Sequence, residues 1–188
     1  MFSILYTSVL VCGYNLIPGV VIQRPFTISN GLSTDHVSCI KDAISEFNSV
    51  ARDFDINTRV TLLDQCTPDR LCNTISYGAN NDSLGYTSIS GFYANTDWYI
   101  EQTNIYISSL VPYHNTCYNI ILHELLHSKG LHHSTVVGSI MNNSISTYPD
   151  GRVYDMDKWN FVLDDLIGLL VSTSFRLFYF MGHRIQIK

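Results

Sequence analysis

Apolar residues recur at intervals of three and four over residues 33–54, a spacing that predicts an amphipathic helix. Ser33 and Thr34 stand at its start, where a side-chain hydroxyl can accept a hydrogen bond from an unpaired backbone N–H. A second helix is predicted over residues 117–129. Its end is placed before Gly130, because glycine is the residue type that most often follows a helix end.

Shorter segments rich in β-branched and aromatic residues alternate with turn-rich segments and predict strands. The predicted strands cover residues 20–28, 59–63, 73–77, 84–93 and 103–108. Pro25 lies in the first strand and favours an edge or bulged position, because proline has no backbone N–H to donate. Apolar residues at helical spacing predict a third helix over residues 156–170.

Length and charge narrow the class of protein. A chain of 188 residues is long enough for one hydrophobic core, and neither a repeat nor an interdomain linker interrupts it. Charged residues make up only 14% of the sequence, against about 25% in an average soluble domain, which suits an extracellular protein. The net charge of -5 and the absence of a basic cluster argue against a nucleic-acid partner, which needs a positive face to neutralise phosphates.

The segment HELLHSKGLHHS, residues 123–134, carries a set of metal ligands. His123 and His127 are four residues apart on the second predicted helix, so their imidazoles project from one face and can share a metal ion. Gly130 can adopt a positive φ and turn the chain back, which brings His133 to the same ion. Three neutral imidazoles with an open fourth position are typical of a catalytic zinc site rather than a closed structural one.

Glu124 stands beside the first of these histidines, where it can act on a water at the metal without being a ligand itself. The full pattern HExxHxxGxxH fixes five positions, and the His, Glu and Gly frequencies of this chain give a chance match of roughly 10⁻⁵. The alternative, a solvated helix face that happens to carry two histidines, is therefore disfavoured.

HExxHxxGxxH is the signature of the metzincin zinc proteases, and the sequence resembles the matrixin family among them. Ser134 follows the third histidine, and Met141 ends the triplet SIM, which resembles the Met-turn of this clan. The resemblance implies an α+β zincin fold: a five-stranded mixed, twisted sheet with two helices, a zinc cleft, and a small C-terminal subdomain with the Met-turn and one helix. It covers most of the chain, with residues 14–170 as the catalytic domain.

The same resemblance implies a role for each motif residue. Zinc would be held by His123, His127 and His133. Glu124 would act as general base and then as general acid in the hydrolysis of peptide bonds in extracellular proteins, and Met141 would lie beneath the site without being a ligand.

Substrate contacts are implied for two segments. In matrixins an edge strand beside the cleft pairs with an extended substrate, and Gly85, Tyr86 and Thr87 are the matching positions; an ordinary sheet strand is the alternative. The chain after the Met-turn, which here includes Tyr148, forms the wall of the P1′ pocket in that family. Residues 142–149 contain no charged side chain, which predicts a preference for apolar P1′ residues.

One zinc ion per chain is expected, because the segment between the third and fifth strands contains no histidine for the structural zinc of matrixins. The oxygen-rich segments around Asp82 and Asp97 leave calcium binding open, although neither has an EF-hand pattern. Leu126 stands where matrixins usually have a small residue, so packing under the zinc helix is expected to differ.

Five cysteines make an odd number. Residues 1–13 fit either a short secretory signal or an N-terminal strand of the mature domain, and removal of that segment would leave four cysteines. Four are compatible with two disulfides in an oxidising compartment. Cys66 and Cys72 bracket a short loop, whereas Cys39 and Cys117 both fall on predicted helices, so these two pairings are one expected connectivity.

Residues 171–188 extend past the usual end of a matrixin domain. They combine aromatic and basic residues with no acid, and Arg176 interrupts a run already short for a membrane span. Packing onto the domain is the main interpretation, and contact with a membrane surface is the alternative.

Two functions are therefore compared. The first is a secreted, monomeric zinc endopeptidase with protein or peptide substrates. The second is a catalytically silent metzincin-fold protein that masks a substrate or inhibitor. The presence of Glu124 in a chain with only three glutamates favours the enzyme hypothesis, because a pure binding protein would need the histidines at most.

Overall fold

The computed structural model describes six segments of the chain. They are residues 14–16, 20–78, 83–94, 97–111, 115–142 and 157–180. Four predicted features lie outside the described residues: Tyr148, Asp82, the segment 1–13 and the last eight residues. In the part of the chain that is described, no helix is long and apolar enough to cross a membrane.

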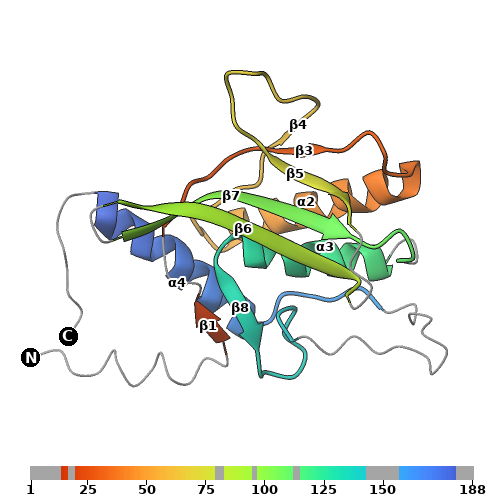
Figure 1. Ribbon diagram of the computed structural model, residues 1–188. Helices are drawn as coiled ribbons and strands as arrows, with labels where there is room; N and C mark the ends of the chain where they lie inside the picture. The colour runs from red at the N-terminus through yellow and green to blue at the C-terminus, as the bar shows by residue number, and fades with distance from the viewer. Residues whose placement is uncertain are drawn as a thin grey trace, which may run out of the picture.

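A six-stranded mixed sheet forms the centre of the described structure (Figure 1). Its strands are β2 (Val20–Val21), β3 (Phe26–Ile28), β4 (Leu62–Leu63), β5 (Asn73–Tyr77), β6 (Gly85–Ala94) and β7 (Asp97–Ile107). β7 pairs in parallel with β2 and β5, β5 with β3, and β3 with β4. Among these described strands only β6 runs antiparallel, and it pairs with β7 along its length. The expected mixed sheet of an α+β fold is confirmed.

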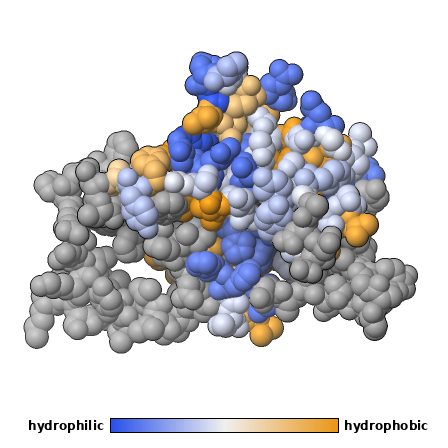
Figure 2. Space-filling model, viewed as in Figure 1, coloured by the Kyte–Doolittle hydropathy of each residue, from blue (hydrophilic) through white to orange (hydrophobic). Residues whose placement is uncertain are grey.

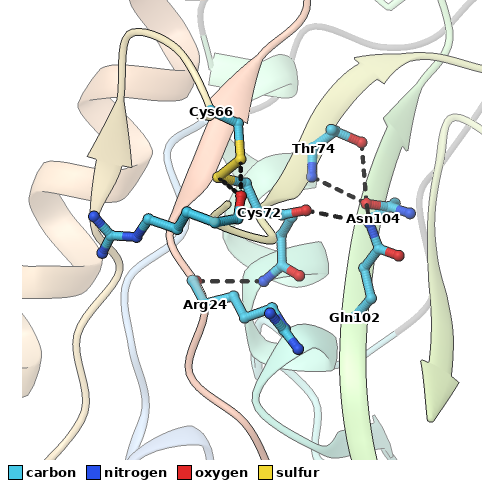
Figure 3. Close-up of a disulfide and its surroundings, with 8 residues drawn as sticks. Arg24, Cys66, Cys72, Thr74, Gln102 and Asn104 are labelled. Carbon is cyan, nitrogen blue, oxygen red and sulfur yellow. Dashed lines mark hydrogen bonds between the residues drawn. A yellow bond between two sulfur atoms is a disulfide. The ribbon is translucent and has the colours of Figure 1, made fainter. Parts of the chain in front are cut away.

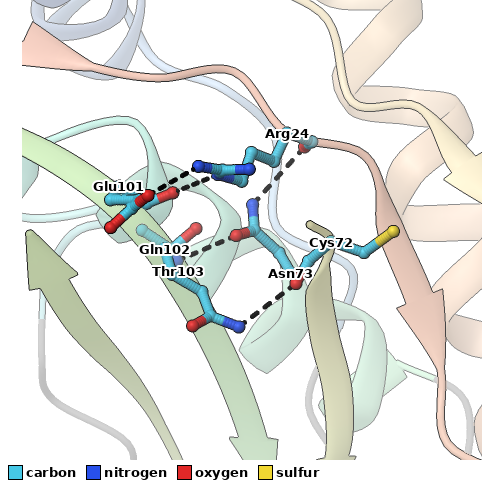
Figure 4. A network of polar contacts seen from close by, with 6 residues as sticks. All are labelled: Arg24, Cys72, Asn73, Glu101, Gln102 and Thr103. Carbon is cyan, nitrogen blue, oxygen red and sulfur yellow. Dashed lines mark hydrogen bonds and ion pairs between the residues drawn. The ribbon is translucent and has the colours of Figure 1, made fainter. Parts of the chain in front are cut away.

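The sheet has six described strands rather than the predicted five, because the strand expected over residues 20–28 is broken. β2 pairs with β7 whereas β3 pairs with β5, so the chain between them crosses from one neighbour to the next. Arg24 holds this crossing: its Nε donates to Glu101 O at 2.6 Å and its Nη2 to Glu101 Oε1 at 2.9 Å (Figure 4). Asn73 N donates to Pro25 O at 2.9 Å, at the point where β3 begins.

Two other strands differ from prediction in length. The strand predicted over 59–63 is reduced to β4, and the strand predicted over 103–108 begins already at Asp97. A bulge in β7 explains the second difference, because Ile100 and Thr103 are both buried although they are three residues apart. The alternation of buried and exposed side chains along the strand is interrupted at the bulge. The hydrophobic pattern of the sequence therefore identifies only the second half of β7.

Helices α2 (Thr34–Asp53) and α3 (Asn115–Ser128) lie behind the sheet in Figure 1 and pack against each other. Both match the predicted helices to within two residues. Ser33 is the N-cap of α2, and its Oγ accepts a hydrogen bond from His36 N at 3.2 Å. Nearly all residues of α3 are buried, which is typical of a helix enclosed within a core rather than one with a solvated face.

The last helix, α4 (Leu163–Phe180), starts later and ends later than predicted. Buried Asn119 explains the late start: its Nδ2 donates to Asp157 O and its Oδ1 accepts from Trp159 N, both at 2.8 Å. These bonds satisfy the backbone in an irregular conformation, so the apolar residues there do not form a helical turn. The helix continues through residue 170 without a break.

The hydrophobic core lies between the sheet and the helices. Its fully enclosed side chains include Phe26, Ile40, Phe47, Ile75, Ile105, Ile121, Leu122 and Leu125. A second sheet of two antiparallel strands pairs β1 (Tyr14–Leu16) with β8 (Leu131–Ser134). β8 directly follows α3 and carries the third histidine of the motif, so the small sheet positions part of the candidate site.

Both expected disulfides are present. Cys39–Cys117 joins α2 to α3 with the Cα atoms 6.2 Å apart, and Cys66–Cys72 closes the loop before β5 with the Cα atoms 6.1 Å apart (Figure 3). Gln102 Nε2 donates to Cys72 O at 3.2 Å, which ties that loop to β7. The four cysteines are thus paired as an oxidising compartment permits.

The polar composition is visible on the side of the molecule shown in Figure 2. The coloured surface there is mostly hydrophilic or neutral, with separate hydrophobic patches. Uncharged polar side chains also join the strands: Thr74 N and Oγ1 both donate to Asn104 Oδ1 at 3.0 Å, and Thr103 N donates to Asn73 Oδ1 at 2.9 Å (Figures 3 and 4). Asparagine and threonine side chains therefore link β5 to β7 by hydrogen bonds.

Candidate metal centre

Helix α3 and strand β8 bring the three motif histidines together. His123 and His127 lie one turn apart on α3, as their spacing predicts. The helix ends at Ser128, and Gly130 adopts a φ of 91° while its N–H donates to His127 O at 2.9 Å. This left-handed conformation turns the chain into β8, so that His133 returns to the face of α3 that carries the other two rings.

The three rings are close enough to share one ion. The ring centroids lie 4.7, 5.2 and 4.9 Å apart, and one nitrogen from each ring lies within 4.8 Å of the others. His127 Nε2 is 3.2 Å from His133 Nε2. A tetrahedral zinc with Zn–N bonds of about 2.0–2.1 Å requires ligand nitrogens about 3.3 Å apart. The distance between His127 and His133 therefore matches the spacing of tetrahedral zinc ligands. Among the described residues, these three histidines are the only group of three or more potential ligand side chains close enough to share one metal ion.

In two of the histidines, a hydrogen bond to a backbone carbonyl determines which ring nitrogen carries the proton. His123 Nδ1 donates to Ile140 O at 2.7 Å, and His127 Nδ1 donates to Leu131 O at 2.6 Å. In each ring Nε2 is then the unprotonated nitrogen, which is the form that binds a metal. Burial lowers the pKa of His123 to about 3 and that of His127 to about 4, with the neighbouring histidines as a further cause, so both rings are neutral near pH 7.

Glu124 lies on α3 with two of the three candidate ligands but faces strand β6. Its side chain is buried, and Thr87 Oγ1 donates to Glu124 Oε2 at 2.7 Å. A Cβ at Gly85 would lie only 2.5 Å from Ile120 Cγ2 and 3.2 Å from Glu124 Oε1, so glycine makes room for the carboxylate. Burial raises the pKa of Glu124 to about 7, and the Thr87 hydrogen bond acts in the opposite direction. A cation held by the histidines would favour the ionised carboxylate further.

The predicted substrate-binding residues on β6 lie beside this carboxylate. Thr87 binds Glu124, and a side chain at Gly85 would approach the same carboxylate. Tyr86 between them belongs to the other face of the strand and stacks on Tyr106 with ring centroids 4.6 Å apart. Within the described sheet β6 pairs only with β7, so its second edge is left for another strand. Whether a substrate uses that edge stays a prediction, and Tyr148 lies outside the described residues.

The segment predicted to be a Met-turn forms a buried turn next to His123. Ile140 and Met141 are fully enclosed, and Asn142 N donates to Ser139 O at 3.0 Å across the turn. Met141 O accepts a hydrogen bond from Ser134 N at 2.8 Å, which joins the turn to the end of β8. The turn therefore contacts both α3 and β8, the two elements that carry the candidate ligands.

Two features of the site were not assigned from the sequence. The sequence predicts only substrate binding for Thr87, although its hydroxyl binds Glu124. It predicts no role for Asp165 of α4, although this residue binds the buried turn. An acidic residue in the first turn of a helix is common for purely local reasons. The sequence therefore held no signal that separated Asp165 from an ordinary helix-capping residue.

The calcium binding left open near Asp82 and Asp97 finds no support in the described residues, and the expected absence of a structural zinc stays a prediction. Asp82 lies outside them, and the histidine group is the one cluster of potential ligands that they contain. The site thus combines three imidazoles, each with a pKa lowered by burial, with a buried carboxylate, an arrangement suited to metal-assisted hydrolysis.

No family model matches this sequence, and no curated protein matches it by sequence. Among solved structures, high choriolytic enzyme 1, a hatching-enzyme zinc protease from the medaka fish Oryzias latipes, is similar at 21% identity with a TM-score of 0.37; the match covers 65% of this chain and 50% of that one. The GM1-bound ECX AB5 holotoxin is similar at 18% identity and a TM-score of 0.34, covering 75% of this chain and 62% of that one. The chain thus spans about half the length of the first, and both TM-scores are too low to establish a shared fold.

Proposed function

We propose that this protein is a zinc-dependent endopeptidase of the metzincin class, resembling the matrixins. The observation that carries the proposal is the three-histidine group, in which one nitrogen from each ring lies within 4.8 Å of the others, together with a buried glutamate on the helix that carries two of the histidines. The motif HExxHxxGxxH supplies these residues in the order that the metzincin signature requires.

His123, His127 and His133 would hold the zinc ion through one nitrogen each. When bound, zinc would supply Lewis-acid polarisation of the scissile carbonyl and make a water acidic enough to be deprotonated near neutral pH. Glu124 accepts a proton on its carboxylate and later donates it to the leaving amine. Thr87 holds Glu124 Oε2, which restricts the carboxylate to one orientation.

The substrate proposed is an extended peptide that adds to the edge of β6 with which no described strand pairs. Main-chain hydrogen bonds would then supply affinity that is independent of sequence, and pockets would select the side chains. The two disulfides favour an oxidising, extracellular location, and a monomer suffices because every proposed catalytic group comes from one chain.

Cleavage of a broad peptide library by the purified protein tests the proposal. We expect hydrolysis that is abolished by a zinc chelator and restored by added zinc. If the zinc-loaded protein cleaves no peptide in the library, the rival function, a silent metzincin-fold binding protein, replaces the enzyme.

Glu124→Ala separates chemistry from metal binding. The variant keeps all three ligands, so it should bind zinc like the wild type while kcat falls by at least about 10²–10⁴, the contribution of a positioned acid/base group. Elemental analysis and steady-state kinetics on the same sample provide both readouts. Cleavage at the wild-type rate would contradict the role assigned to Glu124.

A further inference from the structure

Asp165, in the first turn of α4, is a carboxylate buried in the protein interior with 1% of its surface exposed. Its Oδ1 accepts from Ser139 Oγ at 2.6 Å and faces Met141 N at 3.4 Å, and its Oδ2 accepts from Ile140 N and Val162 N, both at 3.1 Å. A buried carboxylate is tolerated when hydrogen-bond donors surround it. Three of these four donors belong to the single turn that ends at Met141.

The peptide group between Ile140 and Met141 connects this carboxylate to a metal ligand. Its carbonyl oxygen accepts the hydrogen bond from His123 Nδ1 at 2.7 Å. Its N–H donates to Ser139 Oγ at 3.0 Å, beside Asp165 Oδ1. A peptide whose N–H faces a negative group becomes a stronger acceptor at its oxygen, because successive hydrogen bonds polarise one another.

We propose that Asp165 is a positioning residue of the metal centre: it fixes the Ile140 carbonyl, and that carbonyl fixes the ring orientation and tautomer of His123. Asp165 has no contact with the metal or the substrate in this scheme. The inference rests on the proposed zinc centre but not on peptidase activity, so zinc binding alone can test it.

A local role for Asp165 is the competing explanation, because its bond to Val162 N also caps α4. The adjacent Asp164 provides a comparison variant: it lies in the same turn of α4, and its Oδ2 accepts from Ser134 Oγ of β8 at 2.6 Å. Asp165→Asn and Asp164→Asn make the same chemical change and the same change in net charge. In Asp165→Asn, an NH₂ group must replace an oxygen that accepts hydrogen bonds from the turn.

Zinc affinity is measured for both variants by competition with a chromogenic chelator, below the unfolding temperature of each. We expect Asp165→Asn to bind zinc about 10- to 100-fold more weakly, the usual effect of losing a group that orients a ligand, and Asp164→Asn to remain close to the wild type. The visible absorption of Co²⁺ bound in place of zinc should change in Asp165→Asn only, because it reports the geometry of the ligands.

Wild-type zinc affinity and an unchanged Co²⁺ spectrum in folded Asp165→Asn would overturn the proposal and leave Asp165 a helix cap. If that variant does not fold, Ser139→Ala tests the proposal instead, because it removes the hydroxyl between Asp165 and Met141 N. Unchanged zinc affinity and an unchanged Co²⁺ spectrum in Ser139→Ala would also overturn the proposal. A wild type that binds zinc but cleaves nothing would contradict only the proposed peptidase, whereas a wild type that binds no zinc would overturn both.

Discussion

Burial sets the chemical state of the residues at the candidate site. His123 and His127 are kept neutral by desolvation, and each is left with one nitrogen for a metal because the other donates to a backbone carbonyl. Glu124 is also desolvated, which opposes its charge, while the Thr87 hydroxyl favours that charge. A general base near neutral pH requires such a balance between burial and hydrogen bonding.

Thr87 is expected to influence catalysis through this hydrogen bond. Thr87→Val keeps the shape of the side chain but removes the donor to Glu124 Oε2, and a hydrogen bond to a charged group contributes about 1.5–3 kcal/mol, which corresponds to a roughly 10- to 100-fold lower kcat. Thr87→Ser retains the hydroxyl and should retain most of the activity. Equal loss in both variants, measured by steady-state kinetics, would point to packing rather than to the hydrogen bond.

Helix α3 is the element on which the site depends. It is enclosed on nearly all sides, it is joined to α2 by a disulfide, and it is continued by the turn at Gly130 into β8. A helix held in this way keeps two ligands and the glutamate at fixed mutual positions. The third ligand depends on the backbone conformation at one glycine.

The two disulfides should contribute unequally to stability. Cys39–Cys117 spans 78 residues and Cys66–Cys72 spans six, so loop-closure entropy predicts about 4.5 and about 2 kcal/mol respectively. Denaturant unfolding of Cys39→Ala/Cys117→Ala and of Cys66→Ala/Cys72→Ala measures both. A larger loss in the second double variant would show that the constraint on the unfolded chain is not the main effect.

The segment after the buried turn is expected to govern P1′ specificity. Residues 142–149 contain no charged side chain, so a charged P1′ group would be desolvated without a partner. Cuts should fall before Leu, Ile, Met or Phe, with weak discrimination among them, because one methylene changes binding by only about 1–3 kcal/mol. Sequencing of the cleavage sites in a denatured protein mixture measures this preference, and a majority of cuts before charged residues would contradict it.

At the scale of the whole molecule, zinc is expected to stabilise the fold, because its ligands come from both α3 and β8. Free zinc at about a thousandfold above its dissociation constant would add about 4 kcal/mol, which raises Tm by on the order of 10 °C for a protein of this size. Thermal unfolding with zinc and with a chelator measures the shift. His133→Ala should remove most of it, and an equal shift in that variant would place the bound metal elsewhere.

Local sequence patterns were sufficient to predict much of the structure of this protein. The periodicity of α2, the end of α3 before Gly130, the spacing of His123 and His127, and one pairing of four cysteines all follow from residues close together in the chain or from simple counts. A helix that buries one face repeats its apolar residues every three to four positions, so the buried face can be recognised from the sequence alone.

The tertiary structure decided features that depend on distant partners. Asn119 keeps the chain before α4 irregular, the bulge in β7 shifts its buried residues, and β2 and β3 separate because they pair with different strands. Asp165 similarly reaches a turn 24 to 26 residues away. A single hydrogen bond across the fold leaves no periodic trace in the sequence. The approach of the three histidines to one another was therefore predictable from their spacing, whereas the contact of Asp165 with the buried turn was not.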